Sequence, residues 1–378
     1  MAEKSYKGIP GNTIANVLMF FRKTFSPFES VVSNEYGAKI KNSPVMFCCT
    51  HRSHLDYFIL GSLIYRYLHI RRIRFAAGDN LTKLPWLGRS FIGWGAFAVK
   101  RDKAGVRSQL RALCDSVAQM LIGGDSIIVF PEGGRSYGGA MLELKNGILG
   151  AGAMAGDRSP QLPLFFMPVS ITYQYLPELQ WFSAIEKGKK ILKKSKNPLM
   201  RLIGTVYYFG SDLVAMARVL LARRFKIFMG GIYVDFDQPY RLDEMVDVAA
   251  NKSDSRDEFL AHRKSMDIIA QKIAARLFVL YRILPHHMVA ALMKTGKSYT
   301  MAELQNRIAD LRVQVRATGR NTKTIDALTD EQIISQGVND LVHEKAVYNC
   351  KGQISVRNEL PWSYYAATLT SKSTPEES

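Results

Sequence analysis

The sequence predicts an α/β fold in which helices cover a mixed, largely parallel sheet, with helical additions at both ends of the chain. Short apolar runs typical of buried strands alternate with stretches of helical periodicity between residues 41 and 245. Polar or glycine-rich clusters directly follow two of these runs, and the carboxyl ends of parallel strands are where such proteins bind ligands. The predicted strands are residues 45–50, 73–77, 95–99, 126–130, 164–172 and 230–236.

Residues 1–40 are predicted to form an amphipathic helical segment. Apolar side chains recur there at helical spacing, with Arg22 and Lys23 beside them. Such a helix can lie on a lipid surface or pack its apolar face on the domain, and the sequence leaves both alternatives open. The apolar positions are Ile14, Val17, Leu18, Phe21 and Phe25.

Residues 41–245 form the predicted main domain. The run VMFCCT at 45–50 is bounded by Pro44 and a polar cluster, which is typical of a buried strand. The run SIIVF at 126–130 has the strongest strand character in the chain, because β-branched and aromatic residues fill it. Helical periodicity predicts helices over residues 56–68 and 106–121.

Within this domain, residues 186–226 are predicted to be a basic and apolar insertion that faces a membrane. An apolar window at 202–221 follows a cluster of lysines, which is the pattern expected for docking on anionic lipid; a solvated charge run is the alternative. The window contains Asp212 and Arg218, each costly at a bilayer centre, so no membrane span is expected. The lysines are Lys187, Lys189, Lys190, Lys193, Lys194 and Lys196.

The chain beyond the main domain is predicted to be helical over residues 246–370. Ile269, Ile273, Leu277 and Leu280 mark one face of a helix there. Residues 371–378 have the composition of a disordered tail.

The charge balance limits the kinds of partner. The 378 residues contain 51 Lys and Arg against 33 Asp and Glu, a net charge of +18. Such a surface attracts nucleic acid, an anionic membrane, or small phosphorylated substrates and carriers. The four cysteines show neither zinc-site spacing nor the density of a disulfide scaffold, and the N-terminal residues lack a secretory pattern, so a reducing cytoplasm is expected.

A histidine and an aspartate follow the first predicted strand of the main domain. His51 begins the sequence HRSHLD, and Asp56 stands five residues later across a turn into a helix. Imidazole can remove a proton from a hydroxyl near neutral pH and return it later. A nearby carboxylate holds its tautomer and stabilises the imidazolium. His51 and Asp56 are therefore candidate catalytic residues.

A glycine-rich loop follows the strand at 126–130. Gly133 and Gly134 allow backbone N–H groups to approach an anion closely, and Arg135 supplies a forked cationic donor beside them. Glu132 and Ser136 flank these residues, which a simple tight turn would not require. The loop fits neither the phosphate-loop pattern nor the dinucleotide pattern, which argues against nucleotide binding.

Together these residues resemble the conserved blocks of the glycerolipid acyltransferase superfamily. H-R-S-H-x-D-Y and E-G-G-R-S are more similar to its glycerol-3-phosphate and dihydroxyacetone-phosphate acyltransferases than to its lysophosphatidate acyltransferases, which usually have N-H-Q-S and E-G-T-R-S. Lys100-Arg101 stands where the glycerol-3-phosphate branch typically has two arginines. The four blocks occur in family order as THRSHLDYFIL (50–60), GAFAVKR (95–101), FPEGGRS (130–136) and FMPVS (166–170).

The resemblance implies the glycerolipid acyltransferase fold, with residues 41–245 as the catalytic domain. It implies transfer of a fatty acyl group to the sn-1 hydroxyl of glycerol 3-phosphate, the first step of phospholipid synthesis, with His51 as base and Asp56 orienting it. Pro168 is expected to shape the pocket. The residues expected to bind the acceptor are Ser53, Lys100, Arg101, Glu132, Gly133, Gly134, Arg135 and Ser136.

The expected partners follow from the same reaction. The donor is an acyl thioester, either acyl-CoA or acyl carrier protein, and the sequence does not choose between these anionic donors. No cofactor and no metal are expected, and His286 and His287 form a pair without an evident third ligand. Cys49 is expected to be a buried structural thiol. We expect a membrane-associated protein at the cytoplasmic face that does not bind nucleic acid.

Several alternatives stay open. Lysophosphatidate or dihydroxyacetone phosphate could be the acceptor instead of glycerol 3-phosphate. A non-catalytic membrane-binding module would use the basic insertion and the amphipathic helix, but it would not need both intact site blocks. A nucleic-acid binder has only the net charge of +18 in its favour, because no known reader motif accompanies that charge.

Overall fold

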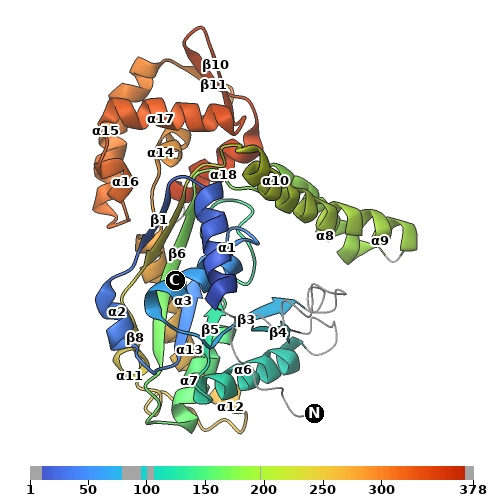
Figure 1. Cartoon of the computed structure of the whole chain (residues 1–378), viewed down its shortest axis with the longest axis vertical. Helices are drawn as coiled ribbons and strands as arrows, with labels where there is room; N and C mark the ends of the chain where they lie inside the picture. Colours follow the sequence, from blue (N-terminus) through green and yellow to red (C-terminus); the bar gives the residue numbers. More distant parts are fainter. Residues whose placement is uncertain (1–10, 79–94, 100–105, 196, 371–378) are drawn as a thin grey trace.

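The computed structural model describes residues 11–78, 95–99, 106–195 and 197–370. It confirms the α/β fold, with a central sheet surrounded by helices (Figure 1). Within the described part, the strands of this sheet are β1 (Phe28–Val31), β2 (Val45–Cys49), β3 (Ile73–Gly78), β4 (Ala96–Val99), β5 (Ser126–Val129), β6 (Phe165–Tyr173), β7 (Ile232–Phe236) and β8 (Tyr240–Arg241).

The sheet is mixed and largely parallel, as predicted. Its order is β1-β7-β6-β2-β5-β3-β4, and β8 pairs with β6. Each adjacent pair in the run β6-β2-β5-β3-β4 is parallel, whereas β7 and β8 are antiparallel to β6. The carboxyl ends of β2 and β5 therefore lie side by side at one edge of the sheet.

Two apolar layers enclose the sheet, and β2 shows why. Its side chains alternate: Phe47 and Cys49 pack in one layer, Met46 and Cys48 in the other. The first layer includes α1 (Gly11–Thr24) and α3 (Asp56–Leu68), and the second includes α6 (Val106–Ile122), α7 (Asn146–Arg158) and α13 (Arg263–Leu280). A strand buried on both faces reads as a continuous apolar run, as the sequence VMFCC does.

The N-terminal segment follows one of the two alternatives left open by the sequence, and it adds a strand that was not predicted. Its amphipathic helix, α1, buries Ile14, Leu18 and Phe21 against the domain, so this apolar face is not available to lipid. The segment also contributes β1, which pairs in parallel with β7. The sequence FESV has no strand pattern of its own, and its pairing with β7 decides its conformation. Three short helices lie near this sheet in the sequence: α2 (Asn34–Lys39) before the main domain, α11 (Leu242–Met245) at its end and α12 (Glu258–Ala261) after it.

The C-terminal region is not purely helical, contrary to the prediction. Its first long helix, α13, packs on α7 and β6, so the predicted boundary at residue 245 cuts through the core. The region also forms a three-stranded antiparallel sheet in the order β10-β11-β9. Its remaining elements are α14 (Pro285–Leu292), β9 (Ser298–Tyr299), α15 (Met301–Ala317), α16 (Lys323–Asp326), α17 (Asp330–His343), β10 (Val347–Cys350), β11 (Gln353–Val356) and α18 (Glu359–Thr370).

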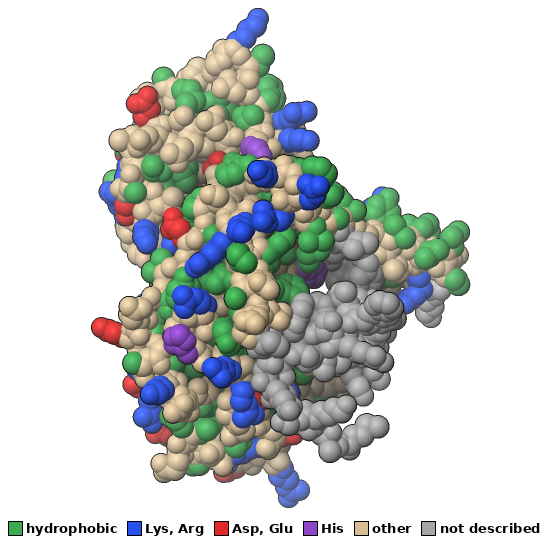
Figure 2. Space-filling model, in the orientation of Figure 1, with side chains coloured by type: hydrophobic (Ala, Val, Ile, Leu, Met, Phe, Trp, Pro, Cys, Tyr) green, Lys and Arg blue, Asp and Glu red, His purple; other side chains and the backbone are tan. Residues whose placement is uncertain are grey.

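The predicted insertion forms a helical arm, defined here as residues 182–225, that projects from the domain (Figure 1). It follows the short helix η1 (Leu179–Trp181) and consists of α8 (Phe182–Lys194), α9 (Pro198–Thr205), the π-helical turn η2 (Val206–Gly210) and α10 (Ser211–Phe225). Figure 2 shows hydrophobic side chains gathered along it. No helix in the described part of the chain is long and apolar enough to cross a membrane.

Candidate active site

The histidine-containing block and the glycine-rich block meet at the carboxyl ends of neighbouring strands. His51 follows β2, and the loop from Pro131 to Ser136 follows β5. Backbone groups of His51 are held by this loop on both sides: its N–H donates to Glu132 Oε1 (3.1 Å), and its carbonyl accepts from the Ser136 N–H (3.3 Å). The position of the histidine is therefore fixed by the second block.

His51 and Asp56 form a hydrogen-bonded pair. The distance from His51 Nδ1 to Asp56 Oδ2 is 2.9 Å, and Asp56 is fully buried at the first turn of α3. The same Oδ2 accepts from the N–H groups of Arg52 (2.7 Å) and Ser53 (2.9 Å), and Oδ1 accepts from the Tyr173 hydroxyl (2.7 Å). These bonds fix the carboxylate, so that it orients the imidazole through Nδ1.

Aromatic rings surround the imidazole. Phe130 stacks on His51 with ring centroids 4.2 Å apart, and Tyr57 meets it edge-on at 5.6 Å. Burial lowers the pKa of His51 below its ordinary value, although the hydrogen bond to Asp56 acts in the opposite direction. The imidazole is therefore neutral at pH 7 and able to accept a proton.

Arg135 lies beside a buried carboxylate. Its side chain is 3% exposed, its Nη1 is 3.8 Å from Glu178 Oε1, and its guanidinium lies 5.4 Å from the centroid of the Tyr137 ring. Gly133 has a φ of 71°, in the left-handed region that glycine adopts without strain. The guanidinium and the turn thus lie within the same loop, next to His51.

Three of the predicted binding side chains hold the loops together in this structure. Glu132 Oε1 and Oε2 accept from the N–H groups of His51 and Leu142 (3.1 and 2.9 Å). Ser53 donates to Glu178, and Ser136 donates to the Ala140 carbonyl. Their roles toward an acceptor stay predictions.

The other predicted site residues lie at different distances from this centre. Gly134 has open space where a side chain would begin. Pro168 lies in β6 opposite Cys48 of β2, within the buried sheet. Lys100 and Arg101 lie outside the described residues.

The sequence did not identify two buried residues that belong to the site. Glu178 accepts from the Ser53 hydroxyl (2.7 Å) and from the His54 N–H (3.0 Å), and burial raises its pKa. Tyr173, at the end of β6, donates to Asp56. Neither stands in a recognisable motif, since each reaches the first block only through tertiary contacts across more than a hundred residues.

The cysteine just before the first block is a buried thiol, as predicted. Burial raises the pKa of Cys49 well above its ordinary value, which keeps the thiol protonated. Cys48 is equally buried, on the opposite face of β2.

The histidine pair of the C-terminal region serves the packing of that region. His286 Nδ1 is 3.2 Å from Asp340 Oδ2, and His287 Nδ1 accepts from the Leu284 N–H (3.1 Å). A different group, Asp157, Glu258 and His262, brings its ligand atoms within 4.8 Å. Lys252 Nζ lies 2.7 Å from Asp157, and Arg158 forms two hydrogen bonds with Glu258. Because cations already neutralise both carboxylates, we assign no metal to this group.

Two family models match successive parts of the chain. The model described as Acyltransferase matches residues 31–172, which contain the four sequence blocks; Tyr173 and Glu178 of the site follow directly after it. The model described as Glycerol-3-phosphate acyltransferase C-terminal region matches residues 212–365.

Curated relatives of the chain are named glycerol-3-phosphate acyltransferase. A glycerol-3-phosphate acyltransferase of Xanthomonas campestris pv. campestris is 29% identical over 278 residues, 72% of this chain and 28% of that protein. Those of Actinobacillus pleuropneumoniae serotype 5b and Pseudomonas syringae pv. tomato are 30% and 27% identical, covering 47% and 71% of this chain and 21% and 30% of the relatives. The chain thus spans less than a third of the length of these relatives.

Among solved structures, the 1-acyl-sn-glycerophosphate acyltransferase of Thermotoga maritima is similar, with a TM-score of 0.36 and 17% identity over 69% of this chain and 78% of that one. The chain thus contains an acyltransferase region followed by a glycerol-3-phosphate acyltransferase C-terminal region, in the order of the two family models, and it is similar to curated glycerol-3-phosphate acyltransferases over most of its length.

Proposed function

We propose that this chain transfers a fatty acyl group from a thioester, acyl-CoA or acyl carrier protein, to the sn-1 hydroxyl of glycerol 3-phosphate. The observation that carries the proposal is the His51–Asp56 pair, with a Nδ1–Oδ2 distance of 2.9 Å, next to the loop that contains Arg135. A base beside a cationic loop suits an acceptor that has both a hydroxyl and a phosphate. The names of the relatives support this acceptor.

In the proposed reaction, Asp56 holds Nδ1 of His51, and Nε2 takes the proton from the sn-1 hydroxyl. The alkoxide oxygen forms a bond to the thioester carbonyl carbon, and the carbon–sulfur bond then breaks. The thiolate leaves with the proton from the imidazolium, so one residue acts as base and then as acid. Arg135, with Lys100 and Arg101, binds the phosphate and aligns the hydroxyl.

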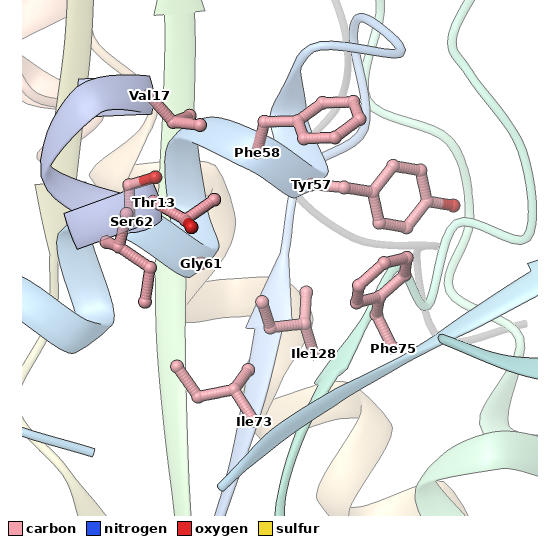
Figure 3. Close-up of a pocket in the computed structure, with 10 residues that line it drawn as sticks. Thr13, Val17, Tyr57, Phe58, Gly61, Ser62, Ile73, Phe75 and Ile128 are labelled. Atoms are coloured by element: carbon pink, nitrogen blue, oxygen red, sulfur yellow. The ribbon is translucent and has the colours of Figure 1, made fainter. Parts of the chain in front are cut away.

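An apolar pocket next to the catalytic histidine suits the acyl chain of the donor (Figure 3). Tyr57 contributes to its wall and also meets the His51 ring, so the pocket begins where the thioester would react. The proposal places the carbonyl at His51 and the hydrocarbon chain behind Tyr57. Thr13, Ile14 and Val17 of α1, Tyr57, Phe58, Gly61 and Ser62 of α3, and Ile73, Phe75 and Ile128 of the sheet line this pocket.

The arm supports a second part of the proposal, docking on an anionic membrane. Leu199, Leu202, Ile203 and Val206 stand at positions i, i+3, i+4 and i+7, and all four are exposed. Exposed cationic residues accompany this stripe on the same arm, which is the chemistry of an interfacial helix. The basic residues are Lys187, Lys190, Lys193, Arg201 and Arg224. Docking would bring the active site to the layer in which acyl chains and products dissolve.

The test of this function is turnover of the purified chain with palmitoyl-CoA and a panel of acceptors. We expect glycerol 3-phosphate to be acylated with a higher kcat/KM than dihydroxyacetone phosphate or lysophosphatidate. A preference for lysophosphatidate would overturn the acceptor, and vesicle binding without turnover on any acceptor would favour a non-catalytic membrane module.

A further inference from the structure

The arginine next to the catalytic histidine is, with Arg282, one of the two largest fully buried side chains in the described part of the chain. Arg52 is 1% exposed. Its Nη1 is 3.8 Å from Glu132 Oε2, and its guanidinium lies 4.8 Å from the centroid of the Tyr281 ring. Within the described residues, its Nε and Nη1 have no hydrogen-bond partner. A buried cation with unused donors is costly for stability, so stability alone does not account for it.

On one side, Arg52 faces the carboxylate that holds the catalytic loop. Glu132 accepts from the His51 N–H and the Leu142 N–H, so its position sets that of the catalytic backbone. Burial by itself would lower the pKa of Arg52, but Glu132 and the neighbouring tyrosines hold it above its ordinary value, and the guanidinium stays charged.

On the other side, Arg52 faces the C-terminal region. Tyr281 ends α13 and is itself anchored, because the next residue, Arg282, forms two hydrogen bonds with Asp235 of β7 (3.0 and 2.6 Å) and one with Glu29 of β1 (2.6 Å). The ring of Tyr281 therefore has a fixed place beneath the guanidinium.

A second contact holds the same region against the site. Tyr364 of α18 is buried, and its backbone carbonyl lies so close to Gly139 that a side chain there would collide with it. Gly139 belongs to the turn whose Ala140 carbonyl accepts from Ser136. The C-terminal region thus supports the glycine-rich loop from behind at two places.

We propose that Arg52 is a positioning residue, through which Tyr281 of the C-terminal region holds Glu132 and, by way of Glu132, the backbone of His51. The inference rests on the proposed function, since it explains how the site of acyl transfer is held. It makes the C-terminal region part of the catalytic unit, even though the four conserved blocks all lie before residue 172.

The test uses the full chain with Tyr281→Leu, which removes a ring that touches neither His51 nor the acyl pocket. We expect kcat to fall about ten- to a hundredfold with KM for both substrates unchanged, because a small displacement of the base weakens alignment without removing a binding contact. Tyr281→Phe keeps the ring and is expected to restore kcat. If Tyr281→Leu does not fold, Tyr281→Met fills more of the space and carries the same expectations.

The matched control is Tyr299→Leu. Tyr299 is also buried in the C-terminal region and also packs on an arginine, with Arg307 5.9 Å from its ring centroid, but it has no contact with the site. We expect it to lower the melting temperature and leave kcat unchanged.

Hydrogen exchange separates the inference from the proposed function. The amides of His51 and Leu142, which donate to Glu132, should exchange faster in Tyr281→Leu than in Tyr299→Leu. Wild-type kcat and wild-type exchange in folded Tyr281→Leu would overturn the inference, as would equal effects of the two variants. A wild-type chain without acyl transfer would instead refute the function, and exchange would still decide the positioning role.

Discussion

At the scale of single residues, the site is built from polar side chains whose bonds fix one another. Both carboxylate oxygens of Asp56 form hydrogen bonds: Oδ2 with the His51 ring and two backbone N–H groups, and Oδ1 with the Tyr173 hydroxyl. Burial lowers the pKa of His51, so the orienting carboxylate is paired with an imidazole that is neutral at pH 7. A neutral, oriented imidazole is the state that a general base requires before it accepts a proton.

Gly61 allows a test of the acyl pocket. It lines the pocket in α3, and a Cβ added there would meet nothing within 4 Å. Gly61→Ala should be active and more stable by about 1 kcal/mol, because alanine favours a helix. Gly61→Met should extend into the pocket and reduce kcat/KM for palmitoyl-CoA relative to decanoyl-CoA, by roughly fourfold for each methylene excluded.

The chain-length ratio of the two thioesters measures this effect, with Gly61→Ala as the matched control. An unchanged ratio in an active Gly61→Met variant would mean that the acyl chain lies elsewhere.

At the scale of elements, parallel strand pairing assembles the site. Block residues separated by 81 positions along the chain, His51 and Glu132, meet because β2 and β5 are neighbours. The arm differs from these strands, because it buries Phe182 and Ile185 in the core but leaves several other apolar side chains exposed. Leu199 and Leu202 are 65% and 61% exposed, values that ordinary packing does not explain.

Charged substitutions on the arm test the membrane docking proposed for it. Leu199→Asp combined with Leu202→Asp should weaken binding to phosphatidylglycerol vesicles, measured by sedimentation, by at least about a hundredfold, since each leucine contributes roughly 1.5–3 kcal/mol when it leaves water. Both positions lie in α9, whose N-terminus is capped by Asn197. Because aspartate is favourable near a helix N-terminus, the arm should stay folded.

Val313→Asp is the control for this experiment. Val313 in α15 is also 65% exposed but lies in the C-terminal region, and its replacement should leave vesicle binding unchanged. Wild-type binding by the arm variant would show that another surface meets the lipid.

The sequence predicted strands best where the local apolar pattern agrees with the buried environment of the strand. The strands at 45–50 and 126–130 are apolar throughout because they are buried on both faces, and they were predicted within one or two residues. By contrast, β1 and the small sheet of β9, β10 and β11 consist of two to four residues each, and only their partners stabilise them.

The candidate site shows the same division. His51, Asp56 and Arg135 could be named from the sequence because each stands in a motif. Glu178 and Tyr281 could not, because they reach the site only through tertiary packing.

At the scale of the whole molecule, the two family models correspond to parts that are physically joined. The first match ends at residue 172 and the second begins at residue 212. The two parts are nevertheless in contact, because α13 packs on β6 and Tyr281 lies against Arg52. The net charge of +18 is consistent with the anionic substrates and the anionic surface proposed for the protein. Acyl transfer by His51 remains the claim on which the rest of this picture depends.

The most direct test compares kcat/KM for acyl transfer from palmitoyl-CoA to glycerol 3-phosphate in the wild-type chain and in His51→Ala. General acid–base catalysis typically contributes a factor of 10²–10⁴, so the variant should lose about a thousandfold while keeping a wild-type circular dichroism spectrum. A folded His51→Ala variant with wild-type turnover would contradict the account.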